Sequence, residues 1–143
     1  MNAKDFLRQA YRLDQKIKSD LGELESLRET ATSLRSPGFE ECHHPNRPTE
    51  AAFVRRLDKV LEMEKKLNEE IDRLVDLKQE IREIIDGVAN TDELMILRYR
   101  YILYYSWEDI ASEMNFSLRW VHVIHSRALA SADDVMKKKY NQS

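Results

Sequence analysis

Two apolar repeats, each advancing by alternating steps of three and four residues, constrain the fold more than any other feature of the chain. The first covers residues 6–34 with one polar slot at Asp20, and the second covers residues 53–88 with polar slots at Glu64 and Lys78. A period near 3.5 is typical of a helix that buries a narrow seam against another helix. The apolar seam positions are Phe6, Ala10, Leu13, Ile17, Leu24, Leu27, Ala31 and Leu34, then Phe53, Leu57, Val60, Leu67, Ile71, Leu74, Ile81, Ile85 and Val88.

The segment between the repeats, residues 36–48, contains all three prolines and cannot be helical throughout. We therefore expect a loop there and a long antiparallel, coiled-coil-like helical hairpin over residues 1–88. Leu61, Leu77 and Ile84 widen the second stripe beyond a two-helix seam. This width predicts a further packing partner, so the hairpin is interpreted as a device for oligomerisation or partner binding.

Composition limits the class of protein. Charged residues make up 34% of the chain, and it has only three glycines and three prolines, which favours long helices over sheets. The net charge is −3, so any contact with nucleic acid must be local. A single cysteine, the absence of a secretion signal and the absence of a long apolar run predict a cytoplasmic protein that does not enter the membrane.

A second helical region is expected over residues 91–135. Gly87 is a plausible end for the preceding helix, and Asn90 with Glu93 three residues later resembles a capping box that starts a new one. Residues 92–105 are apolar on every side, as in a helix buried on two faces. The fold class predicted from these patterns is all-α: the hairpin, followed by a domain of three helices.

The stretch from Ser106 to Leu129 predicts two short helices joined by a tight turn. Ser106 and Ser117 are suited to cap the two helices, and Asn115 tolerates the left-handed conformation that a sharp turn requires. This is helix-turn-helix spacing, in which the second helix, here residues 118–132, enters the DNA major groove. In that helix Val121, Ile124 and Ala128 would face inward.

The outward face of the second helix has no acidic residue, and its basic side chains could donate to guanine and phosphate oxygens while its aliphatic ones meet a thymine methyl. The candidate DNA-binding residues are Ser117, Leu118, Arg119, His122, Val123, Ser126 and Arg127. Spacing alone leaves an ordinary helical pair as the alternative. The basic tail, residues 136–143, contains Lys137, Lys138 and Lys139, which either contact phosphates or are simply solvated.

Other candidate sites are weaker. Cys42, His43 and His44 are consecutive, and three adjacent side chains rarely converge on one metal, so we expect no metal site. His122 and His125 lack a third ligand, and we expect His125 at the edge of the domain. Trp107 and Trp120 are interpreted as packing residues. The chain has no glycine-rich phosphate loop, nucleophile motif or paired carboxylates in a plausible pocket, which predicts a protein that is not an enzyme and needs no cofactor.

The stretch LRYRYILYYSWEDIASEMNFSLRWVHVIHSRAL resembles the C-terminal domain of bacterial sigma factors, which reads the −35 promoter element. It is more similar to a family of small phage and prophage proteins of Gram-positive bacteria. That family also carries segments similar to AYRLDQKIKSDLGELESLR and EEIDRLVDLKQEI. The resemblance covers nearly the whole chain and is strongest over residues 94–129. It implies a transcriptional regulator in a bacterial host, related to the phage late-gene activators of the ArpU type.

The sequence differs from the sigma-factor pattern at positions that would read DNA bases. Leu118 and Val123 stand where sigma factors place charged or amide side chains, so the mode of docking is carried over but the sequence preference is not. The expected partners are double-stranded DNA and a second copy of the chain, in a dimer or higher oligomer, with RNA polymerase as a further candidate. The alternative is an interaction protein that binds polymerase or another host protein and does not bind DNA. In that case Leu118 and Val123 would belong to a protein interface.

Overall fold

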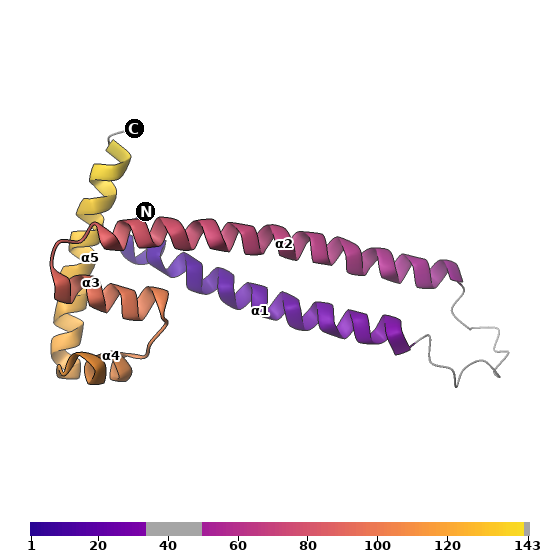
Figure 1. Cartoon of the computed structure of the whole chain (residues 1–143), viewed down its shortest axis with the longest axis horizontal. Coiled ribbons are helices and arrows are strands. Elements are labelled where there is room, and N and C mark those ends of the chain that lie inside the picture. Colours follow the sequence, from indigo (N-terminus) through magenta and orange to yellow (C-terminus); the bar gives the residue numbers. More distant parts are fainter. Residues whose placement is uncertain (34–49, 142–143) are drawn as a thin grey trace. The chain divides into compact units, whose positions relative to one another are not determined.

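The computed structural model describes residues 1–33 and 50–141, and in these ranges the chain is helical with no strand (Figure 1). The all-α prediction is therefore confirmed. The expected loop at residues 36–48, including Cys42, His43 and His44, lies outside the described residues. The elements are α1 (Ala3–Ser33), α2 (Glu50–Asp86), α3 (Thr91–Leu97), the π-helix η2 (Arg98–Ile102), α4 (Trp107–Met114) and α5 (Leu118–Asn141).

The chain divides into two units, and both α1 and α2 contribute to each of them. One unit is formed by residues 14–73, and the other combines residues 1–13 with residues 74–143. In this second unit the start of α1 and the end of α2 are grouped with the C-terminal helices. The physical reason is a set of contacts with α5: the Ala3 amide donates to the Asp133 carboxylate at 2.7 Å, and the Lys139 ammonium pairs with Glu83 at 2.8 Å.

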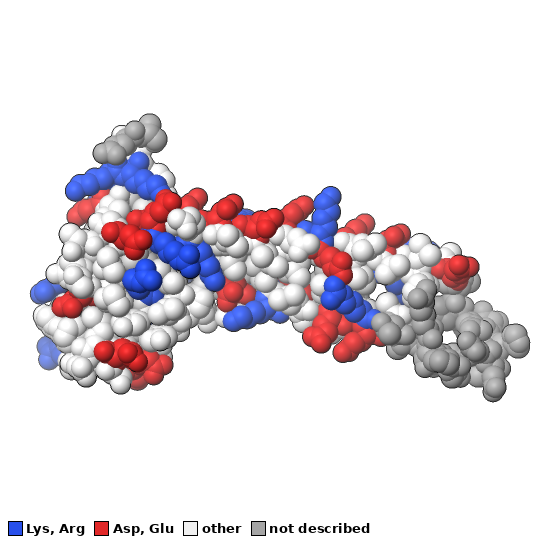
Figure 2. All heavy atoms as spheres, viewed as in Figure 1, with Lys and Arg blue, Asp and Glu red and all other residues white. Residues whose placement is uncertain are grey.

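In the unit of residues 14–73, segments of α1 and α2 run in opposite directions. Ion pairs join Lys16 to Glu70 and Arg28 to Glu64. Residue numbers thus rise along α1 as the numbers of their partners fall along α2, which is the antiparallel arrangement. The buried side chains of this unit are Ile17, Leu24, Ala31, Val60 and Leu67. Carboxylates and cations are interspersed along the visible faces of α1 and α2, as expected for solvated helix surfaces (Figure 2).

Two residues of the predicted second seam are exposed. Leu57 and Ile71 are 43% and 37% accessible, whereas Val60 and Leu67 are buried. The buried Val60, Leu67, Leu74 and Ile81 follow one another at seven-residue steps, so one of the two heptad positions is covered along α2. The other position, which includes Leu57 and Ile71, lies at the margin of the seam. Leu61, which we expected to widen the buried stripe, is also exposed at 54%. The polar slot at Asp20 is occupied by an ion pair with Lys16 at 3.0 Å.

The other unit has its own core. Phe6, Leu7 and Ala10 of α1 are buried, as are Ile81, Ile84 and Ile85 near the end of α2. Ile96 and Leu97 of α3 and Ala128 and Ala132 of α5 are fully buried, and α3 packs on α5. Gly87 ends α2 close to α5: a Cβ atom built on it would lie 2.7 Å from Cγ1 of Val135. A side chain at position 87 therefore conflicts with the position of α5.

The expected helix over residues 92–105 is not continuous. Its α-helical part ends at Leu97, η2 follows to Ile102, and Tyr104 adopts a positive φ of 59°. The Leu103 amide donates to the Arg98 carbonyl at 3.0 Å and the Tyr105 amide to the Tyr99 carbonyl at 2.8 Å. These wider hydrogen bonds rotate the following side chains relative to an α-helix. The apolar residues of this segment therefore lie partly on the α-helix α3 and partly on the π-helix η2, and do not surround one continuous helix.

Candidate nucleic-acid interface

Local hydrogen bonds define the turn between α4 and α5 as the sequence predicts. The Ser106 hydroxyl accepts from the Asp109 amide at 3.1 Å, and the Ser117 hydroxyl accepts from the Trp120 amide at 3.1 Å. Between them Asn115 is left-handed, with φ 55° and ψ 39°. The predicted caps at Ser106 and Ser117 and the predicted role of Asn115 are confirmed. These three residues fix where α5 begins.

A small apolar cluster supports this turn. Ile96 of α3, Ile110 of α4, and Val121 and Ile124 of α5 are its buried members. The partly buried hydrophobic residues packed against it are Tyr99, Tyr105, Trp107, Ala111, Met114 and Phe116. Val121, Ile124 and Ala128 thus face inward, as predicted. The opposite side of α5 is thereby left at the surface.

The predicted site residues lie together on the first turns of α5. Arg119, His122, Ser126 and Arg127 are exposed, and Val123 is half-buried. Ser117 and Leu118, at the start of the helix, are also exposed. Among the described residues, none of the ion pairs involves Arg119 or Arg127. Both guanidinium groups are therefore available to an anionic partner.

Neighbouring aromatic rings position two of these side chains. The Arg127 guanidinium lies over the Trp120 ring, 5.4 Å from its centroid. The His122 ring lies 4.7 Å from the Trp107 ring. Ser126 donates its hydroxyl hydrogen to the His122 carbonyl at 3.2 Å, so its oxygen remains as an acceptor. Trp120 is 40% exposed, which is more than the packing role predicted for it requires.

His125 is buried, not at the domain edge as expected. Its Nε2 lies 2.8 Å from the Tyr101 hydroxyl, and its ring lies 4.7 Å from the Trp107 ring. Burial, followed by the positive charges of Lys4 and Arg100, lowers the pKa of His125 to about 4. The imidazole is consequently neutral at pH 7, and burial raises the pKa of the Tyr101 hydroxyl as well. In the described part of the chain no three potential ligands gather around a metal position.

The acidic residues of this region lie on α4. Glu108, Asp109 and Glu113 are exposed there, whereas α5 has no acid before Asp133. An anion approaching the turn would meet repulsion from α4 and attraction from the first half of α5. The charge distribution thus favours α5 over α4 as the contact for a polyanion.

The predicted basic tail is largely helical, since α5 continues to Asn141 and only residues 142 and 143 lie outside the described ranges. Lys139 pairs with Glu83, which lowers the pKa of that carboxyl group. Lys137 and Lys138 remain exposed on the last turns. The three lysines are thus held on a helix, and one of them has a structural partner.

Arg100 also lies beside this site, although its place in the sequence did not predict it. Its guanidinium lies 4.2 Å from the centroid of the Trp107 ring and donates to the Tyr105 carbonyl at 3.0 Å. Trp107 in turn contacts His122, so a cation on η2 is connected through one ring to the exposed face of α5. The only signal in the sequence was the RYRY run, which spacing alone could not assign to a face.

Comparisons of the chain with protein-family models, curated proteins and solved structures found no match. None of the helices within residues 1–33 and 50–141 is long and apolar enough to cross a membrane.

Proposed function

We propose that the chain is a sequence-specific DNA-binding transcriptional regulator that docks the first half of α5 in the major groove. The observation that carries this proposal is the exposed, acid-free face of α5, which begins directly after a tight turn. Arg119 lies in the first turn of the helix, where recognition helices reach base edges, and Arg127 lies about two turns further on. The arrangement proposed is a helix-turn-helix made by α4 and α5, with α3 as the supporting helix.

The remaining parts of the chain fit this role as follows. Residues 1–88 act as a helical hairpin that joins copies of the chain, because a two-fold dimer presents two recognition helices to two half-sites. The resemblance to prophage regulators of the ArpU type makes phage or prophage promoters the proposed targets and the bacterial cytoplasm the proposed location. RNA polymerase is the proposed protein partner if the protein activates transcription.

The rival function is an interaction protein without DNA binding. Leu118 and Trp120 favour it, because they are 43% and 40% exposed beside Arg119. Tryptophan and arginine are enriched in protein-binding hot spots, and an exposed leucine beside them adds apolar surface. Under this alternative the same face of α5 would bind polymerase or another host protein.

The test compares Arg119→Ala with Arg127→Ala on a selected duplex and on random duplex across a salt series. Arg119→Ala should lose about 1–3 kcal/mol on the selected site and little on random DNA. Arg127→Ala should weaken both and reduce the salt slope by about one ion. Arg82→Ala, which removes an exposed arginine on α2, is the matched control and should bind as the parent does.

Val121→Asp is the structural control, because it buries an unpaired charge and should unfold the domain. If folded Arg119→Ala binds both duplexes as the parent does, α5 does not read the groove. If the parent shows no salt-dependent retention on any duplex, the interaction-protein function replaces this one.

A further inference from the structure

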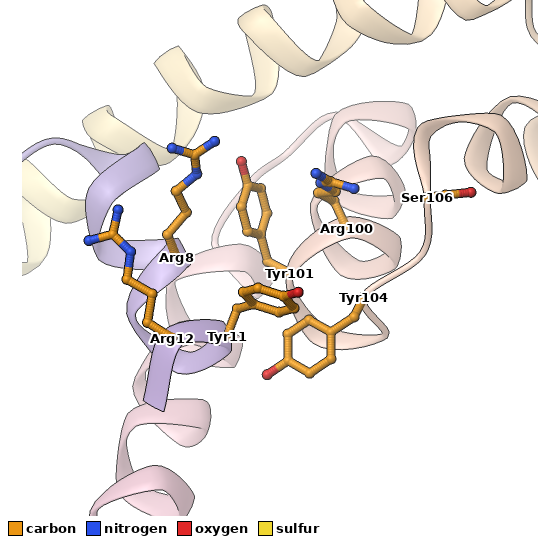
Figure 3. A pocket seen from close by; sticks show the side chains of 7 residues that line it. All are labelled: Arg8, Tyr11, Arg12, Arg100, Tyr101, Tyr104 and Ser106. Atoms are coloured by element: carbon orange, nitrogen blue, oxygen red, sulfur yellow. The ribbon is translucent and has the colours of Figure 1, made fainter. Parts of the chain in front are cut away.

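A pocket of about 480 Å³ lies within the unit formed by residues 1–13 and 74–143, and none of its lining residues belongs to α5. Figure 3 shows side chains from α1 on one side and from η2 and the segment before α4 on the other. A volume of this size is in the range of small-molecule sites, about 300–1,000 Å³. The lining residues are Arg8, Tyr11, Arg12, Arg100, Tyr101, Tyr104 and Ser106.

The lining is basic and contains no carboxylate. Arg8 and Arg12 are four residues apart on α1, so they project from one face of the helix, and Arg100 stands across from them on η2 (Figure 3). Among the described residues, none of the ion pairs neutralises any of these three arginines. Three uncompensated guanidinium groups around one hollow attract an anion and repel a cation.

The fixed parts of the pocket would orient such an anion. Arg100 is held by the Trp107 ring and by the Tyr105 carbonyl. The rings of Tyr11 and Tyr104 meet edge to face with centroids 5.4 Å apart, and they give the pocket an aromatic wall. The positive charges of Arg8 and Arg100 also act on the Tyr101 hydroxyl, where they oppose the rise in pKa that burial causes. The pocket therefore combines a cationic side with an aromatic one.

We propose that this pocket binds a small phosphate-bearing molecule with a planar group, such as a nucleotide, through Arg8, Arg12 and Arg100. Guanidinium groups match phosphate oxygens in paired hydrogen bonds, and tyrosine rings accept a planar base. Bound phosphate would compete with Trp107 and the Tyr105 carbonyl for Arg100. Because Trp107 contacts His122, a ligand in the pocket that moves Arg100 would also shift side chains on the exposed face of α5.

The test is calorimetric titration of the full chain with pyrophosphate and with ATP, comparing Arg8→Gln/Arg12→Gln with the parent. The double variant should weaken both ligands by at least about tenfold, since two charge-assisted contacts are lost. Arg73→Gln/Arg82→Gln removes the same charge from exposed positions on α2 and should bind as the parent does. Arg8→Lys/Arg12→Lys keeps the charge without the planar fork, so it should restore only part of the affinity.

ATP should bind more tightly than pyrophosphate if the tyrosine wall receives the base. Circular dichroism must show that the double variant keeps the helical content of the parent, as expected for exposed side chains on α1. The proposal is overturned if neither ligand binds saturably up to roughly 5 mM, where affinity would be negligible. It is also overturned if Arg8→Gln/Arg12→Gln binds pyrophosphate and ATP as tightly as Arg73→Gln/Arg82→Gln does. The same holds if Arg8→Gln/Arg12→Gln loses affinity for duplex DNA but keeps its affinity for both small ligands. The proposed role of α5 is tested separately by Arg119→Ala.

Discussion

At the scale of single residues, His125 departs furthest from what its position in the sequence suggested. A histidine three residues after His122 could as easily lie at an edge as in a core, and spacing does not distinguish the two. In the structure it is buried beside Tyr101 and Trp107, with the cations Lys4 and Arg100 close enough to disfavour its charged form. The placement depends on η2, whose wider turns no local pattern predicted.

The buried imidazole predicts a pH-dependent stability. Its pKa is about 4 in the folded chain and 6.5 when unperturbed, so the unfolded state binds the proton more readily. The free energy of unfolding should therefore be greatest above pH 6.5 and fall as the pH drops toward 4. After allowance for screening by water, we expect a loss of about 2 kcal/mol over this window.

Urea denaturation of the parent and His125→Gln across that window measures the effect. Glutamine keeps a polar partner for the Tyr101 hydroxyl but does not titrate, so the part of the slope due to His125 should vanish. His122→Gln removes a lesser cause of the lowered pKa of His125, so it should reduce the slope only in part. An unchanged pH dependence in His125→Gln would show that this imidazole titrates normally.

At the scale of elements, the starts of the C-terminal helices were predictable because their signals are local. Asn90, Ser106 and Ser117 each accept a hydrogen bond from the amide three residues later. The reciprocal half of the capping box was not formed, because the Glu93 carboxylate accepts from the Ser131 hydroxyl at 2.8 Å instead. That partner is distant in sequence. Signals within one helical turn predicted where the helices start, whereas the hydrogen-bond partner of Glu93 depends on packing against α5.

The left-handed turn at Asn115 gives the first prediction at this scale. A β-branched residue is strained at φ 55°, whereas glycine adopts this conformation freely. Asn115→Val should lower the free energy of unfolding by about 1–2 kcal/mol, and Asn115→Gly should change it by less than about 0.5 kcal/mol. Thermal denaturation of both variants measures the difference. Equal stabilities would mean that the turn between α4 and α5 does not require the left-handed conformation.

The second prediction concerns the contact between the end of α2 and α5. Gly87→Ala would place a methyl group 2.7 Å from Cγ1 of Val135, whose branched side chain cannot rotate away easily. We expect a loss of about 1–3 kcal/mol in the free energy of unfolding. Val135→Ala in the same chain should recover most of it, and a double-mutant cycle by urea denaturation measures the coupling. Additive effects of the two substitutions would argue against this contact.

At the scale of the whole molecule, the sequence predicted an all-helical chain and most of the apolar residues that the two long helices bury, but not the seam residues that remain exposed. The first repeat is helical as far as the structure describes it, and the second is helical up to Asp86. Ile71 was assigned to the seam, yet it is exposed at 37%, whereas Leu67 of the same helix is buried. A heptad pattern has two apolar positions in each repeat; the one that contains Leu67 is covered, and the one that contains Ile71 lies at the margin of the seam. The uncovered positions are then the places where a second chain could bind.

Val54, Leu57 and Leu61 form such a stripe on α2, with accessibilities of 48%, 43% and 54%. They are three and four residues apart, so they lie on one face of the helix. Single exposed apolar residues are common, but a row of them is typical of an interaction surface. We therefore expect the stripe to join two copies of the chain in the proposed homo-oligomer.

Leu57→Gln/Leu61→Gln should leave the chain folded while reducing its mass in solution to that of a smaller species, because no buried side chain is altered. Leu67→Gln is the matched comparison on the same helix: it places an amide in a buried position and should lower the melting temperature. Light scattering and thermal denaturation over a concentration series separate the two effects. The stripe is not the interface if the double variant keeps the mass of the parent. If the parent itself is monomeric at every concentration, there is no homo-oligomer, and a regulator of this kind would contact its DNA as a single copy of α5.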